Sequence, residues 1–466
     1  MAPRFFNTLG RETTELAPLE PGHVRMYTCG PTVYNVAHIG NLRTFVFEDV
    51  LRRHLKASGY RVTQIMNLTD VDDKTIRGAA QEGLPLADFT RRYKDAFFRD
   101  LNRLNVEPAE RYPPATEHIP EMIAMIQKLK ERGHIYESDG SVWFRIATFP
   151  DYGKLSRIDL TQVRRGERVA DDEYEKEDVK DFALWKAAKP EEPAWDSPFS
   201  RGRPGWHIEC SAMSMKYLGE HFDIHTGAVD NIFPHHENEI AQSEAATGHP
   251  FVNLWLHAEH LLVDGEKMAK SKGNFYTLDD VLARENHPAA VRYLFLSVPY
   301  RRKLNFTWDA LAASAAAVDR IRSAAVRIDE VAASGARKEG GFPAAEKAAK
   351  VRTDFLAAMD DDLNTAEAQG VLFPFLREVN AAIDERTLDA EGARTAREVL
   401  SFTDRVFGVL PAAPEILPAE IEAKIEARNA ARKRRDFAEA DRIRAELSKQ
   451  GIVLEDSPGG TRWKKA

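Results

Sequence analysis

Cysteine is scarce in this chain: only Cys29 and Cys210 occur among 466 residues, and they lie far apart in the sequence. This scarcity excludes a small secreted fold held together by disulfides, and in a reducing compartment we expect no bond between the two thiols. The thiols are left for metal binding, for catalysis or for plain core packing, and composition alone does not choose among these roles.

Long apolar runs and a secretory signal are also missing. No run of about 18 apolar residues occurs, which excludes a membrane-spanning helix. The first residues, Met1–Phe6, lack the apolar core of a secretory signal. We therefore expect a cytoplasmic protein with no membrane partner.

An excess of basic residues is missing too. The net charge of −8 argues against a uniformly basic nucleic-acid binder, although it allows a local basic surface. Residues 417–466 contain 12 Lys or Arg and 9 Asp or Glu, so the tail is mildly basic and the body is acidic. A tail that binds nucleic acid and a solvated helical tail of mixed charge explain this asymmetry equally well.

The overall composition is that of an ordinary globular protein. Near the N-terminus we expect a strand, a helix and a second strand. His23–Thr28 alternates like a half-buried strand, an amphipathic helix follows, and Tyr60–Asn67 has the pattern of a second strand. This order predicts a parallel crossover, whose ligands bind beyond the carboxyl ends of the strands. Cys29 and Asn67–Lys74 follow two such ends, and we expect them to lie near each other.

The length exceeds what one core can organise, and about two to four domains are expected. Region 150–200 is charged and turn-rich, which is typical of an inserted subdomain, and Ala-rich charged helices predominate from about Trp308. The other expected elements are helices over about 85–135, a strand at Ser141–Ile146, a helix beginning near Ser211, strands at Phe222–Gly227 and Leu254–His257, and terminal helices Ala419–Ala430 and Phe437–Lys449.

Four residues could form a metal site. Cys29 and Cys210 offer thiolates, and His235 and Glu239 are spaced i, i+4, so they would share one face of a helix. Such a set suits Zn²⁺. His236 and Glu237 would point away from that face. Spacing alone leaves two buried free cysteines beside a surface helix as an equal alternative.

Two segments could bind phosphate. His38 and Asn41 stand where the first helix begins, and free N–H groups and the helix dipole at that point favour an anion; simple capping by Asn35 or Asn41 is the alternative. The loop Asp264–Asn274 holds three lysines in six residues. It suits a polyphosphate, and an exposed Lys-rich turn is its alternative.

Together these segments resemble the class I aminoacyl-tRNA synthetases, and within them the cysteinyl-tRNA synthetase family. His38–Asn41 is similar to the family's His-Ile-Gly-His element, and Lys267–Ser271 to its Lys-Met-Ser-Lys-Ser loop. Asn41 replaces a histidine and Ala269 a serine, and Glu259–His260 also departs from the family pattern. The resemblance covers essentially the whole chain and extends over Asn67–Lys74, Asp181–Lys186, Gly205–Ser214, Phe233–Gln242, Leu304–Trp308, Asp361–Thr365 and Gly451–Trp463.

The resemblance implies an α/β fold: a Rossmann-like parallel-sheet catalytic domain at 1–310, with an inserted connective subdomain at about 110–200. A helical bundle at 311–414 and a small C-terminal anticodon-binding domain at 415–466 would follow. The implied reaction has two steps. Cysteine and ATP, with Mg²⁺, give cysteinyl-adenylate and pyrophosphate, and cysteine then passes to the 3′ end of tRNA(Cys).

The resemblance also implies roles for individual residues. Catalysis at the ATP phosphates falls to His38, Asn41, Lys267 and Lys270, and nucleotide binding extends to Gly30, Thr32, Gly40 and Ser271. One Zn²⁺ per chain, which selects the thiol, would be held by Cys29, Cys210, His235 and Glu239. The residues implied to frame the amino acid are Thr69, Trp206 and Asp230.

The basic tail would contact the anticodon region of the tRNA through Arg428, Arg432–Arg435 and Arg462–Lys465. Trp463 could stack on a base or simply pack in a small domain. A monomer is implied. Two rival functions remain: a ligase that joins cysteine to an amino sugar, and a non-catalytic, zinc-stabilised RNA-binding paralogue.

Overall fold

The computed structural model describes residues 2–158, 180–269, 272–334, 341–410, 419–449, 452–457 and 460–465. The chain divides into two compact units, Met1–Leu410 and Pro411–Ala466. Within the described part of the chain, no helix combines the length and apolarity that crossing a membrane requires.

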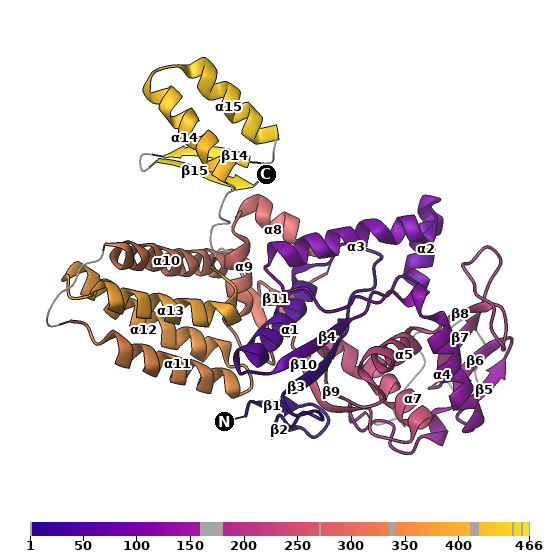
Figure 1. Ribbon diagram of the computed structural model, residues 1–466. Coiled ribbons are helices and arrows are strands. Elements are labelled where there is room, and N and C mark those ends of the chain that lie inside the picture. Colours follow the sequence, from indigo (N-terminus) through magenta and orange to yellow (C-terminus); the bar gives the residue numbers. More distant parts are fainter. Residues whose placement is uncertain are drawn as a thin grey trace. The chain divides into compact units, whose positions relative to one another are not determined.

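Four parallel strands form the central sheet of the first unit, in the order β10-β9-β3-β4 (Figure 1). They are β3 (His23–Thr28), β4 (Arg61–Met66), β9 (Phe222–Ala228) and β10 (Val252–Ala258). Every pairing between neighbours is parallel, which confirms the predicted strands and the parallel relation of the first two. Alternate residues of β3 face opposite sides, since Met26 joins one apolar cluster and Tyr27 the other.

Helix α1 (Ile39–Ala57) connects β3 to β4 and is buried nearly all round. Its polar residues are covered as well as its apolar face, because α9 (Pro288–Phe295) and α13 (Ala390–Phe407) pack against it. Arg292 on α9 is fully buried, forms an ion pair with Asp49 on α1, and donates a hydrogen bond of 2.9 Å to the carbonyl of Leu104. It also donates to the carbonyl of Phe407 at the end of α13.

A separate antiparallel sheet lies within the region where the sequence predicts an inserted subdomain, in the order β5-β6-β7-β8. Its strands are β5 (Ile135–Ser138), β6 (Ser141–Phe144), β7 (Phe182–Ala187) and β8 (Gly202–Pro204). Helix α5 (Trp206–Leu218) follows directly. The predicted start of this helix near Ser211 is wrong: α5 begins five residues earlier, at Trp206, so that Cys210 lies on the helix.

Helices make up most of the remainder of the first unit. Figure 1 shows the bundle helices α10–α13 on one side of the central sheet and β5–β8 on the other. The helices are α2 (Asp73–Glu82), α3 (Leu86–Arg103), α4 (Ile119–Glu131), α7 (Glu237–Thr247), α8 (Leu278–Arg284), α10 (Trp308–Ala333), α11 (Ala344–Asp360) and α12 (Thr365–Asp384). Short strands complete the unit: β1 (Arg4–Asn7), β2 (Glu12–Glu15), β11 (Leu261–Val263), β12 (Glu266–Lys267) and β13 (Leu304–Phe306).

The second unit consists of two helices and a hairpin. Helices α14 (Ala419–Lys433) and α15 (Phe437–Lys449) confirm the two predicted terminal helices, and β14 (Ile452–Ser457) pairs with β15 (Gly460–Lys465). Ile443, Leu447, Ile452 and Leu454 form a small core. Arg428 is only 3% exposed, so the expectation that this side chain is part of an RNA-binding surface is wrong.

Candidate active site and metal-binding cluster

The carboxyl ends of β3 and β4 meet closely. The backbone N–H of Gly30 donates to Oδ1 of Asn67 at 2.8 Å. A Cβ at position 30 would lie 1.7 Å from the carbonyl oxygen of Asn67, so only glycine fits there. Thr32 and Thr69 form a bridge between the same two segments. The predicted closeness of Cys29 to the segment after β4 is confirmed.

Cys29, Cys210, His235 and Glu239 converge from different elements. One ligand atom from each lies within 4.8 Å of the other three, and all four residues are buried. Cys29 follows β3, Cys210 lies on α5, His235 precedes α7 and Glu239 lies in its first turn. Nε2 of His235 lies 3.0 Å from Oε1 of Glu239. The structure therefore brings together all four residues singled out from the sequence.

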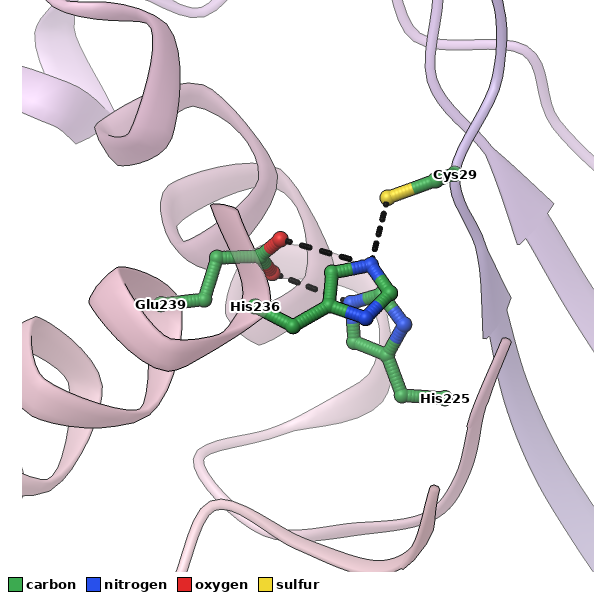
Figure 2. A group of neighbouring side chains, drawn as sticks. All are labelled: Cys29, His225, His236 and Glu239. Atoms are coloured by element: carbon green, nitrogen blue, oxygen red, sulfur yellow. Dashed lines mark hydrogen bonds and ion pairs between the residues drawn. The ribbon is translucent and has the colours of Figure 1, made fainter. Parts of the chain in front are cut away.

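A second set shares two of these residues. Cys29, His225, His236 and Glu239 also offer four atoms within 4.8 Å of one another (Figure 2). Nε2 of His236 lies 3.2 Å from Sγ of Cys29, and Nε2 of His225 lies 2.9 Å from Oε2 of Glu239.

The expectation that His236 points away from the cluster is therefore wrong. The turn Ile232–His236 is a π-helix with extended dihedral angles at Phe233, so the angular spacing of an ordinary α-helix does not apply. Glu237 does point elsewhere, since its carboxylate accepts N–H groups of Gly153 and Ser156 at 2.8 and 2.7 Å.

Further imidazoles surround the cluster. Nδ1 of His236 lies 2.8 Å from Nε2 of His257, and Nδ1 of His207 lies 3.0 Å from Nδ1 of His235. The indole of Trp206 stacks on the His235 ring, with centroids 4.2 Å apart and planes 18° apart. Burial lowers the pKa of His207, His235 and His257 to about 3, so these rings are neutral at physiological pH.

Sequence reasoning missed His207, His225 and His257. His225 and His257 were inside segments correctly predicted as strands, near their carboxyl ends. Polar residues buried at that edge of a parallel sheet are a signal of a site, and that signal could have found them.

The residues at the cluster fit a thiophilic divalent cation. Two sulfurs, an imidazole nitrogen and a carboxylate oxygen are borderline and soft donors. Among the described residues, the buried Oε1 of Glu239 accepts no hydrogen bond; Nε2 of His235 lies 3.0 Å away, but that contact is an ion pair only when the ring is protonated. Burial also raises the pKa of the Cys29 and Cys210 thiols. A buried carboxylate oxygen without a donor is costly unless a cation compensates it.

His38 and Asn41 cap the beginning of α1. The backbone N–H of Asn41 donates to Nδ1 of His38, and Oδ1 of Asn41 accepts the N–H of His38, both at 3.2 Å. The capping alternative is thus confirmed for Asn41. Burial lowers the pKa of His38. Because Nδ1 accepts a hydrogen bond, the proton of the neutral ring is on Nε2, which remains available as a donor.

The lysine loop lies against this helix start. A Cβ at Gly40 would come 2.7 Å from Cε of Met268, and the N–H of Ile39 donates to the carbonyl of Tyr276 at 3.0 Å. The structure therefore brings together the two segments that the sequence marked as phosphate sites. Lys267 is exposed at the end of β12, whereas Lys270 and Ser271 lie outside the described residues.

At the position where the family pattern has serine, the backbone N–H of Ala269 donates to Oδ1 of Asn274 at 2.9 Å. Glu259 and His260 also depart from the family pattern. Their backbone carbonyls accept hydrogen bonds of 2.5 and 2.9 Å from Arg43 on α1.

The three residues expected to frame the substrate amino acid differ in their contacts and in their exposure. The hydroxyl of Thr69 donates to Oε2 of Glu209 at 2.8 Å, next to Cys210 in the chain. Trp206 is 38% exposed beside the cluster. Asp230 is largely exposed, lies 3.5 Å from Nδ1 of His260, and its charge acts on His38. Trp206 thus lies beside the candidate metal-binding cluster, Thr69 contacts the residue before Cys210, and Asp230 lies near the start of α1.

Family comparisons agree with this geometry. Residues 15–316 match the model of the tRNA synthetases class I (C) catalytic domain. Residues 354–411 match the DALR domain, and residues 415–463 match the cysteinyl-tRNA ligase anticodon binding domain. A methionyl-tRNA synthetase of Mycobacterium tuberculosis in complex with methionyl-adenylate has the same fold, with a TM-score of 0.60 and 16% identity over 83% of this chain and 90% of that one. The fold and site define a class I aminoacyl-tRNA synthetase.

Comparison with individual relatives identifies the family within this class. The cysteine–tRNA ligase of Solibacter usitatus is 50% identical over 100% of both chains, and that of Koribacter versatilis is 46% identical over 100% of both. The chain belongs to the cysteine–tRNA ligase family.

Proposed function

We propose that this protein joins cysteine to tRNA(Cys) at the expense of ATP. The observation that carries the proposal is the closeness of two chemically different sites at one edge of the sheet. The thiol–imidazole–carboxylate cluster begins at Cys29, and the anion-binding helix start at His38 follows within the same loop. A substrate carboxylate and an α-phosphate can meet between them.

In the first step the cysteine carboxylate attacks the α-phosphorus and pyrophosphate leaves. No side-chain nucleophile is needed, so the protein contributes orientation and charge stabilisation. Nε2–H of His38, the amide of Asn41 and the N-terminus of α1 hold the phosphates, with Gly30, Thr32, Gly40 and Ser271 lining the nucleotide site. Lys267 and Lys270 neutralise the charge that develops on pyrophosphate, and Mg²⁺ accompanies ATP.

Cys29, Cys210, His235 and Glu239 would hold one Zn²⁺ per chain. When bound, this ion would lower the pKa of a substrate thiol and bind sulfur in preference to a hydroxyl oxygen. Shape alone discriminates by only about 1–3 kcal/mol, so we expect a sulfur-selective site to reject serine more strongly than shape alone would. Thr69, Trp206 and Asp230 frame the amino acid, and the stacking of Trp206 on His235 fixes the orientation of that ring.

In the second step the 3′ end of tRNA(Cys) accepts cysteine while the C-terminal unit holds the anticodon. We assign residues 1–310 to catalysis, with about 110–200 as the connective insertion, 311–414 to the bundle and 415–466 to anticodon binding. We further propose that the protein acts as a cytoplasmic monomer.

The test is cysteine-dependent exchange of pyrophosphate into ATP, followed by charging of a tRNA(Cys) transcript. We expect both reactions, with serine inactive in the exchange. Exchange without charging, but with transfer to an amino sugar, would favour the amino-sugar ligase. RNA binding without exchange would favour the non-catalytic paralogue.

A further inference from the structure

Two residues of the segment His235–Glu239 face away from the metal-binding cluster. They are Glu237 and Asn238, whose side chains contact the loop Tyr152–Ser156 instead. Both side chains are buried, and the proposed function gives neither of them a role. The segment that supplies metal ligands is therefore also the segment that holds this loop.

The Glu237 carboxylate is bound by backbone N–H groups of the loop. Oε1 accepts the N–H of Gly153 at 2.8 Å and that of Leu155 at 3.5 Å, and Oε2 accepts the N–H of Ser156 at 2.7 Å. A carboxylate that is fully buried needs such donors, because burial without them costs several kcal/mol. The loop and the carboxylate therefore stabilise each other in one arrangement.

Two further contacts fasten the same loop along α7. The hydroxyl of Tyr152 donates to Oδ1 of Asn238 at 2.5 Å. Lys154 forms an ion pair with Glu244, about two turns further along the helix. The loop thus follows α7 from its first residue, and Glu237 makes the buried part of the contact.

Glu237 occupies a place from which it can orient metal ligands. It is the first residue of α7 and shares the first turn with Glu239, and it follows the π-helical turn that contains His235. Because that turn departs from ordinary α-helical hydrogen bonding, its own ladder does not fix the direction of the side chains. The loop is anchored in turn, since Leu155 is fully buried in the apolar cluster that contains both cysteines.

We propose that Glu237 is a positioning residue for the metal-binding cluster; the inference rests on the metal site of the proposed function. By binding the N–H groups of the loop, Glu237 fixes the first turn of α7 and so holds His235 and Glu239 where one ion can bind both. Glu237 itself touches neither the ion nor the substrate. Replacing groups that orient metal ligands commonly lowers metal affinity by about 10–100-fold.

The test compares E237Q with a matched control, E244Q. Both variants change a carboxylate on α7 that binds the same loop into an amide. In E237Q the amide has one acceptor oxygen and turns its own N–H groups toward an N–H of the loop. In E244Q only the pair with Lys154 is lost. Y152F is a second, milder variant, which removes the hydrogen bond to Asn238 and leaves Glu237 intact.

Metal binding is measured in two ways on the full chain. Competition with a chelator gives the affinity for Zn²⁺, and the visible absorption of the Co²⁺-substituted protein reports the geometry of the ligands. We expect E237Q to bind Zn²⁺ about tenfold or more weakly and to change the Co²⁺ spectrum. Y152F should change both in the same direction by less, and E244Q should match the wild type.

Pyrophosphate exchange at saturating Zn²⁺ separates positioning from general damage. We expect the KM for cysteine to rise in E237Q while the KM for ATP stays unchanged. Urea unfolding of the metal-free proteins shows whether each variant is folded.

Wild-type Zn²⁺ affinity and Co²⁺ spectrum in folded E237Q would overturn the inference, as would an equal loss in E244Q or an equal rise of both KM values. If E237Q does not fold, Y152F decides, and wild-type metal binding in Y152F then overturns the inference. A wild-type protein that binds neither ion would instead overturn the metal site of the proposed function.

Discussion

Glu48 is a fully buried carboxyl on α1. Burial raises its pKa from 4.5 to about 8, although the Thr226 hydroxyl donates to it at 2.8 Å. Because the folded state binds this proton more tightly than the unfolded chain does, the associated stability is full below about pH 4.5. This stability is lost as pH rises through about 8, by on the order of 5 kcal/mol in all.

The variant E48Q keeps the shape of the neutral acid and cannot ionise. We expect E48Q to be more stable than wild type at pH 8, and to lose most of that advantage at pH 5. Urea denaturation midpoints at the two pH values measure the difference, and exposed Glu346→Gln serves as the control. An advantage of E48Q that is equal at both pH values would show that Glu48 does not titrate in this range.

A substitution at Cys210 tests whether the proposed four-residue site binds a metal ion. The variant C210S replaces a soft thiolate by a hydroxyl, a poor ligand for thiophilic cations. We expect bound metal to fall from about one ion per chain to almost none, and cysteine-dependent exchange to fall with it. Elemental analysis of purified protein measures the metal. Met213→Leu, a buried volume-conserving change on the same helix, should retain it; full metal content in C210S would contradict the assignment.

The sequence could identify ligands by their chemistry but could not give their surroundings. Residue type alone marks four side chains as potential metal ligands: Cys29, Cys210, His235 and Glu239. His236 joins the cluster only because the turn before α7 is π-helical. His225 joins the cluster and His257 lies beside it because β9 and β10 pair in register, with residue 226 beside residue 256. The π-helical turn departs from ordinary helix spacing, and the register of β9 against β10 is a tertiary fact, so neither arrangement could be derived from residue spacing alone.

At the scale of elements, the local sequence pattern predicts α1 and the strands on either side of it. It does not predict the beginning of α5 or the position of β7. The start of α5 was misplaced because its N-cap, Gly205, has no side-chain oxygen to signal a helix beginning. Strand β7 stands in a stretch that reads as turn-rich, and its partner β6 lies about forty residues earlier. Long-range pairing of this kind cannot be read from a local pattern.

An exposed aromatic residue at the beginning of α15 leads to a prediction about the second unit. Phe437, the first residue of α15, is 61% exposed and follows the cations Arg432–Arg435. An exposed ring beside cations suits an unpaired base, and stacking of this kind contributes about 1–3 kcal/mol. We expect F437A to weaken tRNA(Cys) binding about fivefold or more without changing pyrophosphate exchange or stability. Fluorescence anisotropy measures the affinity.

Val326→Ala, which removes another exposed apolar side chain, is the control, since Val326 is 57% exposed on α10. Unchanged affinity in F437A would assign base recognition to other residues of the C-terminal unit. Deletion of residues from 417 onward should likewise reduce charging and spare cysteine activation.

At the scale of the first unit, Arg292 joins parts that are distant in sequence. It pairs with Asp49 on α1 and donates to the carbonyls of Leu104 and Phe407, which stand at the ends of α3 and α13. Replacement by alanine leaves these buried carbonyls without their donor and opens a cavity. We expect R292A to cost about 3–5 kcal/mol. Urea unfolding followed by tryptophan fluorescence suits the test, since six of the seven tryptophans lie before residue 411.

The control is R327A, which breaks the pair of Arg327 with Asp384, 36% and 68% exposed, and should cost under about 1 kcal/mol. Because α1 begins at the residues assigned to the ATP phosphates, a loosened Arg292 junction should lower pyrophosphate exchange and tRNA charging by the same factor. A decrease confined to charging would show instead that the junction serves the tRNA-binding side of the protein. Equal costs for R292A and R327A would mean that the buried network contributes no more than a surface pair.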